Sequence, residues 1–128
     1  MHKYTLYGVE LQQNRLNMRV LVCGGRDYTD YRRVQDVLKN WNITCIIQGE
    51  ARGADTLARQ YAERHRVDVL SFPALWDKHG KAAGPIRNAQ MLAEGKPDFV
   101  VAFPGGRGTQ NMINQAMKAG IEVKVVEI

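Results

Sequence analysis

Short apolar runs alternate with longer amphipathic stretches along most of the chain. The runs are rich in β-branched residues and bounded by turn residues, which is typical of strands buried on both faces of a sheet. They lie at Val20–Cys23, Ile43–Ile47, Val67–Phe72, Phe99–Phe103 and Val123–Val126. The stretches between them have helical patterns, at Tyr31–Asn40, Asp55–Arg64, Pro85–Ala93 and Thr109–Ala119. Because each parallel strand pair needs a crossover, this alternation predicts a doubly wound α/β domain with a mainly parallel five-stranded sheet.

The predicted helices carry start and stop signals. Asp30 is placed to cap the first helix and Thr109 the fourth, and Pro85 suits the first turn of the third. Gly95 and Gly120 are placed to end the third and fourth helices.

The chain of 128 residues has the length of one domain. We assign that domain to residues 18–128 and treat residues 1–17 as an N-terminal extension. The extension is an upstream start, a cloning remnant or an extra edge strand at residues 4–7, and the sequence leaves these alternatives open. No apolar stretch approaches the ~18 residues of a membrane span, so we expect no membrane partner.

The cysteines and the net charge indicate the cellular location and the kind of partner to expect. Cys23 and Cys45 lie inside strand-like runs without CxxC spacing, which predicts buried free thiols, no metal site and a reducing, cytoplasmic location. The formal net charge of +5 suits an anionic partner. The basic residues are spread out and few aromatics alternate with them, which disfavours a broad nucleic-acid surface.

Glycine–arginine loops follow three of the apolar runs and precede helical patterns. They are Cys23–Asp27, Gly49–Asp55 and Pro104–Thr109. Glycine lets backbone N–H groups approach a ligand, a helix start offers unpaired donors, and arginine binds phosphate or carboxylate. Since the carboxyl ends of parallel strands meet at one edge of the sheet, we expect these loops to converge on a phosphate-bearing ligand.

The longest connection, Pro73–Gly84, is a candidate lid over that edge. It contains Trp76, which is either a core plug or a stacking surface for a base, and the basic Lys81. The chain lacks the full GxGxxG fingerprint and the GxxxxGK[ST] loop, which disfavours a dinucleotide-dependent dehydrogenase and a P-loop NTPase. We therefore expect no cofactor.

Four segments in this order give the chain a family resemblance. They are Gly24–Asp27, Ala51–Asp55, Gly80–Asn88 and Pro104–Thr109. Together they resemble the YspA-related branch of the SLOG superfamily, and the resemblance spans about Met18 to Ile128. It implies a Rossmann-like fold and a nucleotide or ribose-phosphate pocket. The superfamily includes the LOG phosphoribohydrolases and the DNA-processing DprA proteins.

The LOG enzymes pair an arginine with a glutamate in a Pro-Gly-Gly-x-Gly-Thr-x-x-Glu motif. Arg87 matches the arginine, whereas Met112 occupies the glutamate position and offers no carboxylate. Glu50, Asp27 and Asp55 are the candidates for a replacement, because each lies in a strand-end loop.

We predict a protein that senses or sequesters a nucleotide-derived, phosphate-bearing ligand. The alternatives are a hydrolase of an N-glycosidic or phosphoribosyl bond, with Arg87, Glu50 and Asp27 as catalytic candidates, and DprA-like binding of single-stranded DNA. A homodimer or higher oligomer is an expectation from the resemblance. The residues expected to bind the ligand are Gly24, Gly25, Arg26, Asp27, Gly49, Arg52, Gly53, Asp55, Trp76, Lys81, Gly84, Arg87, Asn88, Pro104, Gly105, Gly106, Arg107, Gly108 and Thr109.

Overall fold

The computed structural model describes residues 4–7 and 17–127, and it contains one sheet in the order β1-β6-β5-β2-β3-β4. The strands are β1 (Tyr4–Tyr7), β2 (Met18–Cys23), β3 (Ile43–Gln48), β4 (Asp68–Ser71), β5 (Phe99–Ala102) and β6 (Glu122–Val126). The five strands from β2 to β6 are parallel, which confirms the predicted parallel sheet. β1 adds an antiparallel strand beside β6, with Tyr4 opposite Val126. Apart from β1 and Asn17, the N-terminal extension lies outside the described residues.

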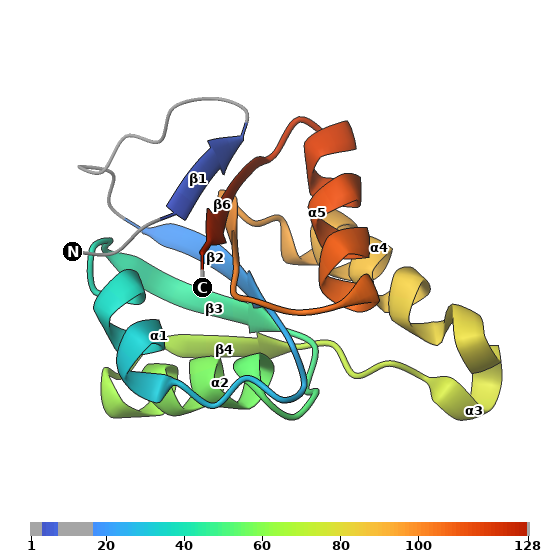
Figure 1. Ribbon diagram of the computed structural model, residues 1–128, viewed down its shortest axis with the longest axis horizontal. Coiled ribbons are helices and arrows are strands. Elements are labelled where there is room, and N and C mark those ends of the chain that lie inside the picture. The colour runs from blue at the N-terminus through green and yellow to red at the C-terminus, as the bar shows by residue number, and fades with distance from the viewer. Residues whose placement is uncertain (1–3, 8–16, 128) are drawn as a thin grey trace.

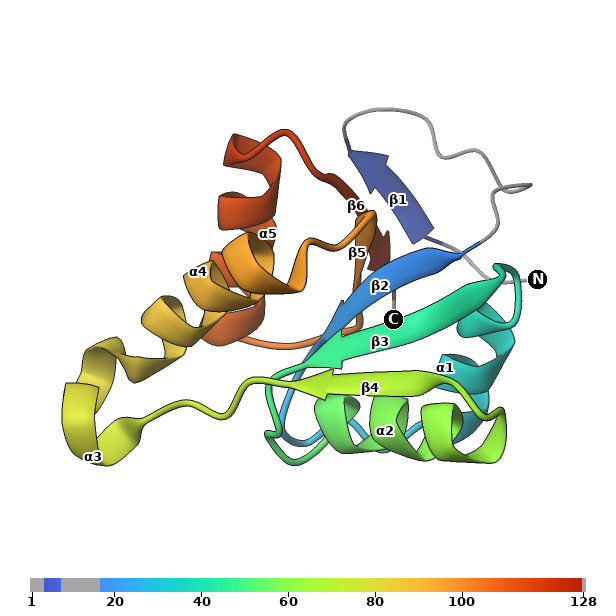
Figure 2. The same cartoon turned by 180° about the vertical axis from the view of Figure 1, so that it is seen from behind.

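Helices cover both faces of the sheet, as expected for a doubly wound fold. They are α1 (Tyr31–Leu38), α2 (Ala54–Arg64), α3 (Trp76–His79), the 3₁₀ turn η1 (Gly80–Ala82), α4 (Ala83–Gly95) and α5 (Arg107–Lys118). In Figure 1, α1 and α2 lie on one side of the strands and α4 and α5 on the other, while α3 projects from the end of the molecule. The reverse view in Figure 2 shows the same separation.

Alternate side chains of β2 enter two separate cores. Val20 and Val22 pack with α1 and α2, whereas Leu21 and Cys23 pack with α4 and α5. Burying one such aliphatic side chain contributes roughly 1.5–3 kcal/mol, so both faces of the strand must be apolar. The continuous apolar runs in the sequence therefore follow from burial on two faces.

Two of the predicted helix boundaries are confirmed. Asp30 caps α1 by accepting a hydrogen bond of 3.0 Å from the Arg33 backbone N–H. Gly120 follows the end of α5 with φ of 77° and donates to the carbonyl of Met117. Together with the bond from Ile121 to Ala116, this is a Schellman motif, which needs a residue in the left-handed region.

Two other boundaries differ from the prediction to different degrees. The prediction for Thr109 is wrong, because α5 begins at Arg107 with Gly106 as its N-cap and Thr109 lies inside the first turn. α4 does end at Gly95 as predicted, but the residue that takes the left-handed conformation is Lys96, with φ of 50°. Gly95 is small for packing, because a Cβ would lie 3.1 Å from the Ile47 side chain.

The connection between β4 and α4, which the sequence singled out as a candidate lid, contains secondary structure of its own. It holds α3 and η1, and α4 begins at Ala83, before Pro85. Trp76 is 47% exposed, so the interpretation of this side chain as a core plug is wrong. None of the helices in the described part of the chain is both long and apolar enough to cross a membrane.

The order of the strands changes direction at β2. The chain runs outward through β2, β3 and β4, then returns to the other side of β2 and continues through β5 and β6. The loops that follow β2 and β5 meet where the direction changes: Gly25 N–H donates to the Pro104 carbonyl at 2.9 Å, and Phe103 N–H donates to the Cys23 carbonyl at 2.9 Å. Ligands of open α/β sheets bind at this point of the fold.

Candidate functional site

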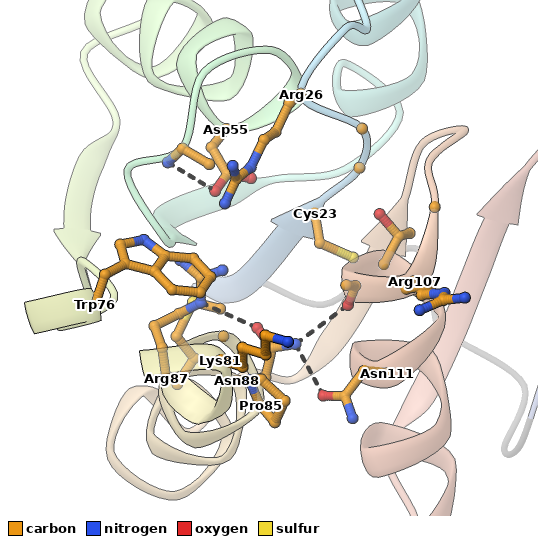
Figure 3. A pocket seen from close by; sticks show the side chains of 18 residues that line it. Cys23, Arg26, Asp55, Trp76, Lys81, Pro85, Arg87, Asn88, Arg107 and Asn111 are labelled. Carbon is orange, nitrogen blue, oxygen red and sulfur yellow. Dashed lines mark hydrogen bonds between the residues drawn. The ribbon is translucent and has the colours of Figure 1, made fainter. Parts of the chain in front are cut away.

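A cavity of about 590 Å³ opens at the point where the strand order reverses. Its wall combines the loops after β2, β3 and β5 with residues of α3, η1, α4 and the N-terminal part of α5 (Figure 3). The lining residues are Cys23, Gly24, Gly25, Arg26, Ala51, Asp55, Trp76, Lys81, Gly84, Pro85, Arg87, Asn88, Met91, Gly106, Arg107, Gly108, Thr109 and Asn111. The structure thus brings together most of the residues that the sequence singled out. We call this the main cavity.

A second cavity of about 430 Å³ adjoins the main cavity. Its lining residues are Arg26, Gly49, Glu50, Ala51, Arg52, Pro73, Ala74, Trp76 and Arg87. Arg26, Ala51, Trp76 and Arg87 line both cavities. We call this the side cavity, and it holds Gly49 and Arg52 from the predicted binding set.

Four of the predicted binding residues line neither cavity: Asp27, Gly53, Pro104 and Gly105. The Asp27 side chain is 93% exposed and pairs with Arg52 at 3.1 Å. Gly53 and Gly105 are packed against the backbone of the β2 loop rather than turned toward a ligand. A Cβ on Gly53 would lie 2.6 Å from the Arg26 carbonyl carbon, and one on Gly105 would lie 2.6 Å from the Gly25 nitrogen.

The other two glycines of the third loop, Gly106 and Gly108, differ from Gly105 in their surroundings. A Cβ added to either would meet nothing within 4 Å apart from adjacent residues and the helix's own backbone. Both residues line the main cavity at the beginning of α5, where no side chain caps the helix. The first backbone N–H groups of a helix have no intrahelical partner, and they carry the positive end of the helix dipole. This end of the cavity is therefore suited to an anion.

Arg87 lies between the two cavities and is half-buried. Its Nη1 donates to the Gly49 carbonyl at 2.7 Å, and its Nε donates to the Asn88 Oδ1 at 3.0 Å. Burial lowers the pKa of the guanidinium, and the nearby Asp55 carboxylate partly offsets this effect. The group stays charged at neutral pH, because arginine does not lose its proton in proteins.

Asp55 is a buried carboxylate in the wall of the main cavity, with 6% of its surface exposed. Its Oδ2 accepts hydrogen bonds of 3.2 Å from the backbone N–H groups of Gly49 and Ala51, which hold the β3 loop in place. Burial raises the pKa of the Asp55 carboxyl, and the backbone hydrogen bonds and nearby arginines oppose the rise. Oδ2 therefore holds the β3 loop, while no hydrogen bond to Oδ1 is recorded among the described residues.

Asn88 joins α4 to α5 beneath the cavity. Its Nδ2 donates to the Gly108 carbonyl at 3.2 Å and to the Asn111 Oδ1 at 3.1 Å, as drawn in Figure 3. Gln115 also donates to Asn111, at 2.7 Å. This network positions the first turn of α5 relative to Arg87.

The sequence analysis missed several lining residues. In the main cavity these are Cys23, Ala51, Pro85, Met91 and Asn111, and in the side cavity they are Pro73 and Ala74. The signal for Asn111 was available, because it lies one residue before Met112 on a helix whose first turn faces the ligand edge. Both cysteines are free and buried as predicted, and burial raises the pKa of the Cys23 thiol, which keeps it neutral.

Trp76 contributes an exposed aromatic surface to both cavities. The Arg26 guanidinium lies over its ring, 5.4 Å from the centroid, in a cation–π contact. Figure 3 shows the indole at the mouth of the cavity, across from Asp55 and Arg26. An indole exposed in this way is available to stack on a planar ligand group.

The remaining carboxylate candidates have partners of their own. Glu50 has an unusual backbone φ of 59° and pairs with Arg59 at 2.9 Å. Met112 is fully buried in the core between the sheet and α5, and it lines neither cavity. Within the described ranges, no three His, Cys, Asp or Glu side chains gather in a way that could hold a metal ion.

Comparison with known proteins places the chain in a family. A family model described as "YspA, cpYpsA-related SLOG family" matches residues 18–79, which run from β2 through α3. The "Gene 61 protein" of Mycobacterium phage D29 is 37% identical over 118 residues, covering 82% of this chain and 93% of the phage protein. The chain belongs to the YspA and cpYpsA-related SLOG family.

Proposed function

We propose that this protein binds a nucleotide-derived, phosphate-bearing small molecule in the main cavity. The observation that carries the proposal is the convergence of Arg26, Arg87 and the uncapped start of α5 on one cavity at the reversal of strand order. Membership of the SLOG family supports a nucleotide-related ligand. Only Asp55 brings a carboxylate to the wall of this cavity among the described residues, so the wall favours an anion.

The parts of the cavity suit different parts of such a ligand. The N–H groups at Gly106, Arg107 and Gly108, with the Arg107 side chain, would bind the phosphate. Asp55 Oδ1 would accept a hydrogen bond from a ribose hydroxyl, and the exposed face of Trp76 would stack on the base.

Ligand binding to the folded state alone raises the melting temperature, and this tests the proposal. At about 100 times its Kd, a ligand adds ~2.7 kcal/mol to the free energy of unfolding. The panel consists of the four common nucleoside 5′-monophosphates, ribose 5-phosphate and ADP-ribose, each at millimolar concentration in phosphate-free buffer. Arg107→Gln should reduce the shift, while the exposed Arg32→Gln on α1 serves as the matched control. A panel without any shift contradicts the proposal.

A hydrolase is the second candidate, and the buried Asp55 carboxylate favours it. In such a reaction the oxygen of water bonds to C1′ and the bond from C1′ to the base nitrogen breaks. The base keeps the electron pair and takes up a proton, which leaves ribose 5-phosphate. Asp55, with its pKa raised by burial, would accept the proton of the attacking water, while the start of α5 holds the phosphate.

Release of free base from the nucleoside monophosphates distinguishes the two candidates. Asp55→Asn should abolish release, whereas Glu50→Gln should leave it intact, because Glu50 is paired with Arg59 outside the main cavity. If the wild-type protein in molar excess over bound substrate releases no base, the protein is a binding module. Release that survives in Asp55→Asn removes this carboxylate from the mechanism.

A further inference from the structure

The side cavity contains positively charged groups beyond those that a mononucleotide in the main cavity would contact. Three arginines line it, Arg26, Arg52 and Arg87, against the single carboxylate of Glu50. That carboxylate is already paired with Arg59 at 2.9 Å. The side cavity therefore offers an excess of positive charge, which is suited to an anionic group of its own.

The arginines of the side cavity have guanidinium N–H groups that can donate hydrogen bonds to a ligand. Arg87 uses one hydrogen bond from Nε and one from Nη1 to fix its position, which leaves the remaining N–H groups of its guanidinium. Arg26 has no carboxylate within ion-pair distance in the part of the chain that the structure describes. Arg52 pairs with Asp27, but both side chains are mostly exposed, at 75% and 93%. Exposed pairs of this kind contribute little stability, so a ligand can replace Asp27.

The two cavities also form one continuous surface. Arg26, Trp76 and Arg87 line both of them, so a single ligand can extend from one into the other across these residues. Arg107, at the beginning of α5, lines only the main cavity, and Arg52 lines only the side cavity. Each cavity thus carries an arginine that the other does not share.

We infer that the side cavity is a second anion subsite, and that the ligand is a nucleotide with phosphate groups at two positions. One phosphate binds at the α5 end of the main cavity, and the second binds to Arg52 and Arg87 in the side cavity. Nucleoside 3′,5′-bisphosphates belong to this class, whereas ADP-ribose, whose two phosphates are joined directly, is a probe for the shorter spacing. The inference rests on the proposed function, because it extends the ligand of the main cavity.

Calorimetric titration at constant ionic strength tests the subsite. The probes are the 5′-monophosphates of adenosine, guanosine, cytidine and uridine, the corresponding 3′,5′-bisphosphates, and ADP-ribose. We expect at least one two-phosphate probe to bind the wild-type protein tenfold or more tightly than the monophosphate with the same base. Arg52→Gln should remove that gain and leave the affinity for the monophosphate unchanged. Arg107→Gln should weaken both kinds of probe, and Arg32→Gln neither.

Failure of the subsite and failure of the main cavity give different results. If monophosphates bind and the second phosphate adds nothing, the side cavity is not an anion subsite, while the proposed function stands. The same conclusion follows if Arg52→Gln weakens both kinds of probe equally. If no probe binds at all, the proposed function and this inference are both wrong.

Discussion

The two sides of the main cavity are built in different ways. On one side, the loops after β2 and β5 are joined by backbone hydrogen bonds and packed so closely that Gly24 and Gly25 have no room for a side chain. On the other side, α3 contains no buried residue, and both Leu75 and Trp76 are about half exposed.

This difference suggests that one side of the cavity fixes its shape and the other side determines which ligand is preferred. Closely packed backbone resists local opening, so the loops after β2 and β5 hold the start of α5 at a constant place. The segment around α3 has few buried contacts, so its side chains can change at little expense in stability. We therefore expect the phosphate position to depend on the packed side and the preference for a base to depend on Trp76.

The largest expected effect concerns glycines on the packed side. Gly53→Ala should lower the free energy of unfolding by about 3 kcal/mol, because the added methyl group overlaps the β2 loop and the backbone φ is 82°. Gly105→Ala should lower it by roughly 2 kcal/mol through overlap with the backbone of Gly24 and Gly25 and with the Thr109 side chain, without the strain of a positive φ. Urea unfolding measures both values. Wild-type stability in both variants would contradict the close packing described here.

Trp76→Ala is expected to affect binding rather than folding. Loss of base stacking costs about 1–3 kcal/mol, so the affinity for a nucleoside monophosphate should fall roughly 5- to 150-fold. The free energy of unfolding should change by less than about 0.5 kcal/mol, because the side chain is half exposed. Leu75→Ala is the matched control, because Leu75 directly precedes Trp76 and its side chain is about equally exposed. Titration with ribose 5-phosphate should show no loss in the Trp76 variant.

Asp55→Asn should change how stability depends on pH. The folded state raises the pKa of Asp55 above its ordinary value of 3.8, so between these two values the folded protein binds more protons than the unfolded chain. The contribution of Asp55 to stability is therefore largest at low pH and declines as the pH rises through the folded pKa. Urea unfolding at a series of pH values measures this effect. As the pH rises through this range, the free energy of unfolding of the Asp55→Asn variant should increase relative to that of the wild type. A difference that is independent of pH would show that Asp55 titrates normally.

The smallest expected effect concerns an open glycine of the third loop. Gly108→Ala should raise the free energy of unfolding by about 0.5–1 kcal/mol, because Gly108 lies in the first turn of α5 with free space around a Cβ. Because this methyl group would occupy the phosphate end of the main cavity, the affinity for ribose 5-phosphate should fall. If the variant is more stable and binds ribose 5-phosphate as tightly as the wild type, the phosphate does not bind next to Gly108.

Most of the fold could be predicted from the sequence. Strands buried on both faces need continuous apolar runs, and crossover helices need apolar residues at a helical period. Both patterns involve residues close together in the sequence, so they can be recognised without the structure. Asp30 and Gly120 were predictable for the same reason, since caps depend on a few neighbouring residues. Thr109 was misassigned, because the N-cap of α5 is Gly106, three residues earlier, and the left-handed residue that ends α4 is Lys96 rather than Gly95.

The candidate site was less predictable than the fold. The three loops carried a clear signal, and the structure does bring them to one edge of the sheet. The sequence did not separate Gly53 and Gly105, which pack against backbone, from Gly106 and Gly108, which face open space. Asn111 was also not singled out, although it directly precedes Met112, because which residues of α5 face the cavity depends on how this helix packs against α4.

By itself, the sequence determined the doubly wound topology, the edge of the sheet where we propose that the ligand binds and the positive charge of that edge. Those properties follow from hydrophobic period, turn residues and the residues placed at strand ends. Only the tertiary structure decided that Arg26, Trp76 and Arg87 join two cavities, and that Asp55 rather than Asp27 or Glu50 enters the main one. The physical reason is that burial and charge pairing arise between segments distant in the chain, where no local pattern records them.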